Sequence, residues 1–282
     1  MKRLFLGAAL LAAVLWTVPG CEREFVPRSP GETSSGETAP VPEESPPQDP
    51  VPPPAPQITE GTLLAIGDIM MHTPQLPGAY NPETKSYDFS GFFSVLAPMF
   101  RQADWAFANL ETPIAGDEHG FRGYPRFNAP VALADAMADA GFDIVSTANN
   151  HSLDQGFHGL ANTYRILSEK GMHPIGTADT EDASRKIVTL EKNGISGAFL
   201  AYTYGTNGIP IPKDKPWAIQ LIDENRISED IRAARAKNAD FVAVSLHFGN
   251  EYQRTPSEEQ KRVARAVIEA GADVVLGHHP HV

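Results

Sequence analysis

Short apolar runs in this chain lead to side chains that can bind a metal ion. The runs are LLAIG, WAFANL, IVSTAN, FVAVSL and VVLGH, and they lead to Asp68, Glu111, Asn150, His247, His279 and His281. Their length and β-branched content are typical of strands buried on both faces of a parallel sheet. Sites in open α/β sheets are built at the carboxyl ends of the strands. We therefore expect one polynuclear metal site at this edge.

The ligand types indicate which metals such a site would hold. Cys21 is the single cysteine, so the site would use nitrogen and oxygen ligands, which suit Mn, Fe or Zn. Glu111 can bridge two cations through its two oxygens, as two-metal sites require. A buried carboxylate such as Asp68 must be paired or metal-bound. His151 follows Asn150, and we expect it to act beyond the metals as an acid or anion stabiliser.

Four of these runs open with an aspartate: Asp104, Asp143, Asp240 and Asp273. An aspartate at a helix-to-strand turn is common by itself, because its short side chain bonds to nearby backbone. We interpret these four as turn residues rather than ligands.

Other polar residues could support the site. His72, His278 and Glu251 lie near the expected strand ends and are candidates for further ligands or for partners of ligating histidines. Arg122 and Arg126, in FRGYPRFNAP, could hold phosphate or carboxylate groups bidentately, although a solvated loop is an equal alternative. The remaining histidines read as ordinary surface or packing residues: His119, His158 and His173.

From about residue 59, strands alternate with helices. We expect strands at 62–67, 104–109, 143–148, 187–191, 196–203, 240–246 and 273–277, and helices at 91–102, 130–140, 157–170, 226–238 and 256–270. Thr255 and Pro256 predict the start of the last helix, and EKNGISG predicts a hairpin turn. The order implies an α/β fold with a mixed, largely parallel sheet and helices on its faces.

The N-terminal region reads differently from the rest. Residues 1–20 form a secretory signal pattern whose ending resembles a bacterial lipoprotein signal, which would leave Cys21 for lipidation. An ordinary cleaved signal with an incidental cysteine is the alternative. Residues 21–58 are rich in proline and read as a disordered tether, and 59–282 as one folded domain. We therefore expect an extracytoplasmic protein, lipid-anchored to a bacterial membrane through Cys21.

The net charge of -12 at pH 7 and the lack of a basic stripe argue against a nucleic-acid partner. The length of 282 residues leaves enough chain after the tether for one substantial α/β core.

Five segments in order, GDIMMH, FANLETPI, STANNHSLDQG, SLHFGNEY and GADVVLGHHPHV, resemble the motif series of the CapA family. These are bacterial poly-gamma-glutamate (capsule) synthesis proteins related to calcineurin-like metallophosphoesterases. The resemblance implies a four-layer α/β/β/α sandwich and two divalent metal ions. It places Asp68 on the first metal, Glu111 as the bridge and His151 in the catalytic position. The other implied ligands are Asn150, His247, His279 and His281.

The sequence departs from the phosphoesterase pattern in its second motif, where Glu111 replaces the usual Asp. The longer side chain can alter metal spacing, so phosphatase activity does not follow automatically. Because the family normally continues past GHHPHV, we also expect the domain to be C-terminally truncated at Val282.

The resemblance implies a role in poly-gamma-glutamate or capsule-polymer synthesis or export, with an anionic polymer or phosphorylated substrate. Capsule-synthesis membrane proteins are the implied partners. Two alternatives remain: a general extracellular metallophosphoesterase, and a non-catalytic assembly subunit of a capsule complex.

Overall fold

The structure is a computed structural model, and it describes residues 58–282. Its first sheet has the order β1-β4-β5-β6, and all neighbouring strands are parallel. The strands are β1 (Leu63–Ile69), β4 (Trp105–Leu110), β5 (Ile144–Ser146) and β6 (His173–Ile175). The Pro-containing β6 was not predicted, because proline disfavours central strands; here it lies at the sheet edge, where proline is tolerated.

The second sheet has the order β10-β9-β8-β7. Its strands are β7 (Val188–Lys192), β8 (Ile195–Thr203), β9 (Phe241–His247) and β10 (Val274–His278). Strands β7 and β8 are antiparallel and the other neighbouring pairs are parallel, so the expectation of mixed, largely parallel sheets is confirmed. The predicted hairpin turn joins β7 to β8, with Asn193 and Gly194 both at positive φ.

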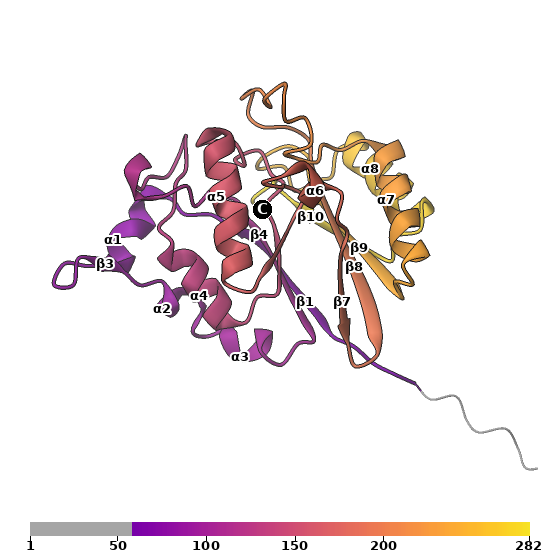
Figure 1. Cartoon of the computed structure of the whole chain (residues 1–282), viewed down its shortest axis with the longest axis horizontal. Helices are drawn as coiled ribbons and strands as arrows, with labels where there is room; N and C mark the ends of the chain where they lie inside the picture. The colour runs from indigo at the N-terminus through magenta and orange to yellow at the C-terminus, as the bar shows by residue number, and fades with distance from the viewer. Residues whose placement is uncertain (1–57) are drawn as a thin grey trace, which may run out of the picture. The chain divides into compact units, whose positions relative to one another are not determined.

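Helices cover the outer faces of the two sheets (Figure 1). On the first sheet lie α4 (Ala132–Ala140) and α5 (Gly156–Glu169), and on the second lie α7 (Glu224–Ala236) and α8 (Glu258–Glu269). The short elements are η1 (Thr73–Gln75), α1 (Leu76–Ala79), β2 (Tyr80–Asn81), β3 (Ser86–Tyr87), α2 (Ser90–Phe93), α3 (Ala97–Phe100), η2 (Asp117–His119) and α6 (Glu181–Ser184).

Three of the four apolar clusters among residues 58–282 correspond to the three interfaces between layers. Alternation along β4 sends Ala106 and Ala108 toward α4, whereas Trp105 and Phe107 face the second sheet. The middle core also contains Phe199 of β8, so the two sheets pack face to face. The third core joins β8 and β9 to α7 and α8. The chain is thus a four-layer α/β/β/α sandwich, which confirms the expected fold class.

Two helix predictions were wrong in detail. The expected helix 91–102 is two short helices, α2 and α3, and Pro98 lies in the first turn of α3. Proline lacks an N–H and disfavours the helical conformation of the preceding residue, which explains the break. Helix α8 is capped by Ser257 in a capping box with Gln260, not by Thr255, because the Ser257 hydroxyl accepts from the Gln260 N–H.

The four strand-opening aspartates hold the amino ends of the sheets. Each accepts a hydrogen bond from a backbone N–H near the start of a neighbouring strand, at 2.7 to 2.9 Å: Asp104 from Thr62, Asp143 from Ala106, Asp240 from Ser196 and Asp273 from Val242. They are turn residues, as expected, and they also fix where adjacent strands begin.

Within residues 58–282, no helix has the length and apolar character needed to cross a membrane. Cys21, the signal pattern and the tether lie outside the described residues.

Candidate metal centre

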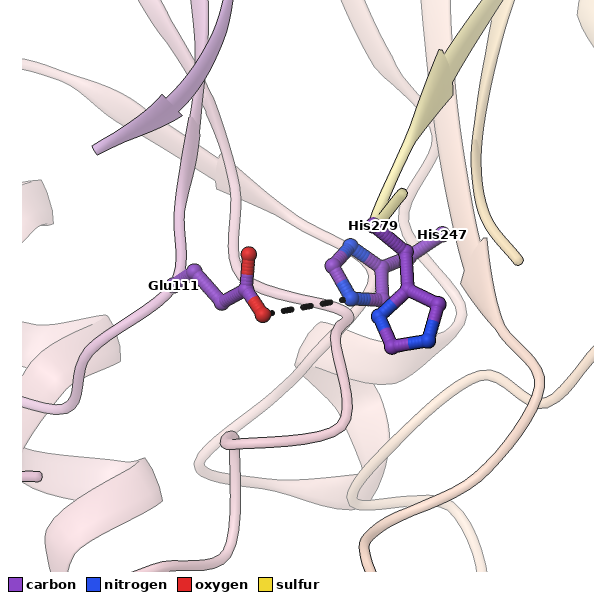
Figure 2. A group of neighbouring side chains, drawn as sticks. All are labelled: Glu111, His247 and His279. Atoms are coloured by element: carbon purple, nitrogen blue, oxygen red, sulfur yellow. Dashed lines mark ion pairs between the residues drawn. The ribbon is translucent and has the colours of Figure 1, made fainter. Parts of the chain in front are cut away.

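The predicted ligands lie where the strands of both sheets end. Asp68 lies near the end of β1 and Glu111 directly follows β4, whereas His247 is the last residue of β9 and His279 follows β10. Strands β1 and β10 are neighbours across the two sheets, so their ends meet. Figure 2 shows the Glu111 carboxylate from the first sheet directed toward the His247 and His279 rings from the second.

Glu111 is the buried centre of this group. Its side chain has no exposed surface, and neither carboxylate oxygen has a hydrogen-bond partner among residues 58–282. Its Oε1 lies 3.5 Å from Nε2 of His247 and 3.7 Å from Nε2 of His281. A buried carboxylate without hydrogen bonds is strongly unfavourable unless a cation neutralises it.

The electrostatics of Glu111 lead to the same conclusion. Burial, and then the charge of Asp68 and the contact with it, raise the pKa of Glu111 to about 9. Two carboxyl groups this close resist being ionised together in a dry site. Divalent cations between them would reverse that preference, because they favour the ionised form of both groups.

Asp68 faces the same space and is held by a neighbouring amide. The Nδ2 of Asn109 donates to its Oδ1 at 2.8 Å, and the backbone N–H of His279 approaches its Oδ2 at 3.4 Å. The other Asp68 neighbours are imidazoles, with Nδ1 of His281 at 3.3 Å and Nδ1 of His278 at 3.7 Å. Asp68 is thus oriented by Asn109 toward the histidines that follow β10.

His247 is held in its neutral form. Burial, followed by the neighbouring histidines, lowers the pKa of His247 well below its ordinary value. Its Nε2 lies 2.9 Å from Oδ1 of Asn150, and its Nδ1 lies 3.3 Å from Nδ2 of Asn109. Neutral imidazole is the form that binds metals, so the environment favours ligation.

The histidines after β10 reach the site through unusual backbone. His279 has φ 101° and His281 has φ 54°, so neither residue has the extended backbone of a strand. Positive φ is uncommon for residues with a Cβ, and such strain clusters at functional sites. The two imidazoles therefore meet near Asp68 and Glu111 because the backbone turns, not because of strand alternation.

The donor set fits divalent metal ions. Ligand atoms within 4.8 Å of one another form the groups Glu111, His247, His279; Asp68, Glu111, His281; and Glu251, His279, His281. Glu111 belongs to the first two groups, which is the position a bridging carboxylate takes between two ions. Among residues 58–282, neither oxygen of Glu111 nor Nδ1 of His279 has a hydrogen-bond partner, so these atoms are not occupied by other contacts.

His151 sits beside this set and is oriented by an acid. Its Nδ1 lies 2.8 Å from Oδ2 of Asp154, and both side chains are almost fully buried. The same oxygen accepts from the backbone N–H of Phe127 at 2.7 Å. The other ring nitrogen, Nε2, lies 3.4 Å from Nδ2 of Asn207.

Comparison with known proteins agrees with the motif series. The family described as "Bacterial capsule synthesis protein PGA_cap" matches residues 62–282. Among curated relatives, the "PGA biosynthesis protein CapA" of Bacillus subtilis (strain 168) is 30% identical over 226 residues, which is 77% of this chain and 56% of the relative. The "Capsule biosynthesis protein CapA" of Bacillus anthracis is 28% identical over 232 residues, covering 78% and 54%.

The chain belongs to the PGA_cap family of bacterial capsule synthesis proteins. This confirms the resemblance to the CapA family. The chain spans about half the length of the curated relatives it matches, 54% and 56% of the two Bacillus proteins.

Solved structures give weaker matches. A candidate 5′-nucleotidase from Staphylococcus aureus in complex with alpha-ketoglutarate aligns with TM-score 0.49 and 14% identity, covering 78% of this chain and 45% of that one. The NAD nucleotidase NadN of Haemophilus influenzae aligns with TM-score 0.42 and 13% identity, covering 68% and 32%. Scores at this level support no conclusion about the activity of this PGA_cap chain.

The candidate supporting residues lie at different places in this PGA_cap domain. His278 stacks on Phe107, with ring centroids 5.7 Å apart, and neither of its ring nitrogens has a hydrogen-bond partner among the described residues. Glu251 is exposed and shares a ligand group with His279 and His281. The His72 ring packs edge-on against Phe127 at 5.0 Å and belongs to no ligand group within residues 58–282.

The two candidate substrate-binding arginines donate to backbone carbonyls. Arg122 donates to His119, and Nη1 of Arg126 to Asp154 at 3.4 Å. Within the described residues, neither forms an ion pair with a carboxylate. Arg126 is the one that lies next to the acid partner of His151.

Sequence reasoning missed the residues that orient the ligands. Asn109 contacts both Asp68 and His247, Asp154 holds His151, and the Tyr204 ring packs 4.9 Å from His279. Asp154 had a usable signal, since it lies three residues after His151. Asn109 lies inside an apolar strand pattern, and its polar role depends on pairing across the sheets.

Proposed function

We propose that this chain is a membrane-anchored extracytoplasmic PGA_cap protein that acts in poly-gamma-glutamate synthesis or export through a two-metal hydrolase centre. The observation that supports it best is Glu111, a fully buried carboxylate with both oxygens unpartnered within residues 58–282 and set between Asp68 and the neutral His247. Such a group is costly for stability alone and is explained by cations that it binds.

In this proposal Glu111, which two ligand groups share, would help to hold two divalent ions. Asp68, Asn150, His247, His279 and His281 complete the two sets, and His278 and Glu251 lie close enough to assist. Divalent ions bound there would polarise the scissile bond and activate water. Nitrogen and oxygen donors without sulfur suit Mn, Fe or Zn.

The protein's own groups would position the substrate and move a proton. His151, with Nδ1 held by Asp154, presents Nε2 as the atom that donates a proton to the leaving group. Asn109 keeps the Asp68 carboxylate fixed, which limits the reorganisation needed during reaction. The burial of Glu111 and His247 keeps water away from one side of the centre.

The substrate in this proposal is an anionic polymer or a phosphorylated compound. A protein of net charge -12 needs local positive charge to hold a polyanion, and the metal ions would supply it. Arg126, beside Asp154, is placed to add to it, and Arg122 contributes from the neighbouring loop. Capsule-synthesis membrane proteins are the proposed partners, since the relatives are named for capsule and PGA biosynthesis.

The anchoring part of the proposal rests on the sequence before residue 58. A signal pattern ending at Cys21 and a proline-rich tether would attach the domain to a bacterial membrane on its outer side. A Cys21→Ser substitution should shift the protein from the membrane to the soluble fraction of cells. If the Cys21→Ser chain stayed in the membrane fraction as fully as the wild type, anchoring through Cys21 would be ruled out.

General extracellular phosphoester hydrolysis is the second candidate. The His151–Asp154 pair favours it, because a histidine oriented by a buried acid suits protonation of an alkoxide leaving group. This candidate needs the same metal set and differs only in substrate.

The experiment compares both substrates on the purified full chain. Metal-dependent shortening of polyglutamate, abolished by Glu111→Gln and retained in the exposed control Glu83→Gln, is the expected result. Phosphodiester hydrolysis without polyglutamate cleavage would favour the second candidate function, general phosphoester hydrolysis. If the metal-loaded, folded chain cleaved neither polyglutamate nor the phosphodiester, the proposal of a hydrolase would be overturned and a non-catalytic assembly subunit would be favoured.

A further inference from the structure

A second group of metal-competent side chains lies outside the strand-end site. The short helix η2 carries Glu118 and His119, and the first turn of α5 carries His158. Their ligand atoms all lie within 4.8 Å of one another, and the group shares no residue with the strand-end set.

The distances suit one small ion. Nε2 of His119 lies 3.7 Å and Nε2 of His158 lies 3.6 Å from the same oxygen, Oε1 of Glu118. Ligands bound tetrahedrally at the usual Zn–N and Zn–O lengths are about 3.4 Å apart. The observed separations therefore need only small side-chain rotations to close on an ion.

The loop that carries two of these ligands is held in place by hydrogen bonds. Nδ2 of Asn128 donates to the carbonyls of Gly116 and Gly120 at 2.9 and 3.1 Å, so both ends of η2 are fixed. The Glu118 carboxylate folds back over Gly116, where φ is +119° and an added Cβ would come within 2.5 Å of it. Because Gly116 leaves that space open, the carboxylate can face the two imidazoles.

The ring nitrogens are available. Nε2 of His119 is shielded from solvent and has no hydrogen-bond partner among residues 58–282. Nε2 of His158 lies 3.1 Å from Nδ2 of Asn162, which also donates to the carbonyl of Ala115. An ion bound to His158 would replace the contact with Asn162, and Asn162 would keep its hydrogen bond to Ala115.

We propose that Glu118, His119 and His158 form a second binding site for a divalent transition-metal ion of the Zn²⁺ class. Two imidazoles and one carboxylate favour Zn²⁺ over Mg²⁺ or Ca²⁺, which prefer oxygen ligands. Glu118 and His158 are exposed, so the fourth coordination position is open to water or to a ligand. An ion here ties η2 to the start of α5, directly after the turn that carries His151 and Asp154.

The test counts bound zinc in the full chain after equilibrium dialysis against low-micromolar Zn²⁺. The double variant His119→Ala/His158→Ala should hold about one ion fewer per chain than the wild type. His173→Ala, which removes an exposed histidine on β6, should hold the wild-type number. The result is a difference between chains with the same strand-end site, so it does not depend on whether that site is filled.

A conservative variant keeps the test informative if the double variant misfolds. Glu118→Gln retains the shape of the side chain and should weaken zinc binding at this site by about tenfold. Circular dichroism of each variant confirms that the fold is retained. Unchanged zinc stoichiometry in the double variant, or unchanged affinity in folded Glu118→Gln, would overturn the proposal.

Discussion

Acidic side chains at the two ends of the strands differ in their hydrogen bonding and burial. At the amino ends, Asp104, Asp143, Asp240 and Asp273 each accept a backbone N–H at 2.7 to 2.9 Å. At the carboxyl ends, Glu111 is completely buried and neither of its oxygens accepts a hydrogen bond from residues 58–282. The four aspartates lie partly in solvent or at the surface, whereas Glu111 does not.

This difference separates stability from function. A carboxylate that accepts a backbone N–H contributes to folding, since both partners are satisfied. A buried carboxylate beside Asp68 and the neutral His247 lowers stability unless something else binds it. We infer that the amino ends fix strand positions and the carboxyl ends are reserved for ligands.

Removing a carboxylate at the carboxyl end should have the largest effect. Glu111→Gln keeps the side-chain size but removes the charge shared by two ligand groups, and should weaken metal binding at least about 100-fold. Isothermal titration with Mn²⁺ measures the change. Wild-type affinity in Glu111→Gln would show that the two ends do not differ as we infer.

Mn²⁺ bound at the carboxyl ends of the strands should stabilise the folded chain. A cation at about 100 times its dissociation constant adds about 3 kcal/mol to the free energy of unfolding. Thermal unfolding with and without Mn²⁺ should show a rise of about 5 to 10 °C in the wild type. The rise should be lost in Glu111→Gln and kept in Asp143→Asn.

Asp154 tests a polar group that orients a side chain without joining the ligand groups. Asp154→Asn weakens the hold on Nδ1 of His151 and should lower the metal-dependent rate about 10- to 100-fold. Metal stoichiometry should stay unchanged, because Asp154 belongs to no ligand group within residues 58–282. A parallel loss of metal would make Asp154 part of the metal centre and contradict its orienting role.

The amino ends should show the smallest and purely structural effect. Asp143→Ala removes the acceptor for the Ala106 N–H and should lower the free energy of unfolding by about 1 to 2 kcal/mol. Urea unfolding measures it, and metal affinity should not change. A loss of metal affinity would show that strand position at the amino end controls the site.

The sequence predicts where the candidate ligands lie in the fold, because their positions follow from strand periodicity. A buried strand must end near its last apolar residue, so Glu111 and His247 could be placed without knowing the fold. The break between α2 and α3, the short strand β6 and the Ser257 cap were missed, since each depends on local competition around proline or between possible caps.

The orienting contacts could not be predicted from one sequence. Asn109 reaches Asp68 in its own sheet and His247 in the other, which depends on how the two sheets pack. The turn that brings His279 to the site depends on positive φ at a residue with a Cβ, which local preference disfavours. Glu118 and His158 likewise lie on separate elements, η2 and α5, and no sequence spacing indicates that they come together.

The most direct test of the central claim is elemental analysis of the purified full chain beside Glu111→Gln and Asp143→Asn. The account predicts that Glu111→Gln holds about two transition-metal ions fewer per chain than the wild type, and that Asp143→Asn holds the wild-type number, as expected for a carboxylate shared by two metal ions. Equal metal content in the wild type and in folded Glu111→Gln would contradict it.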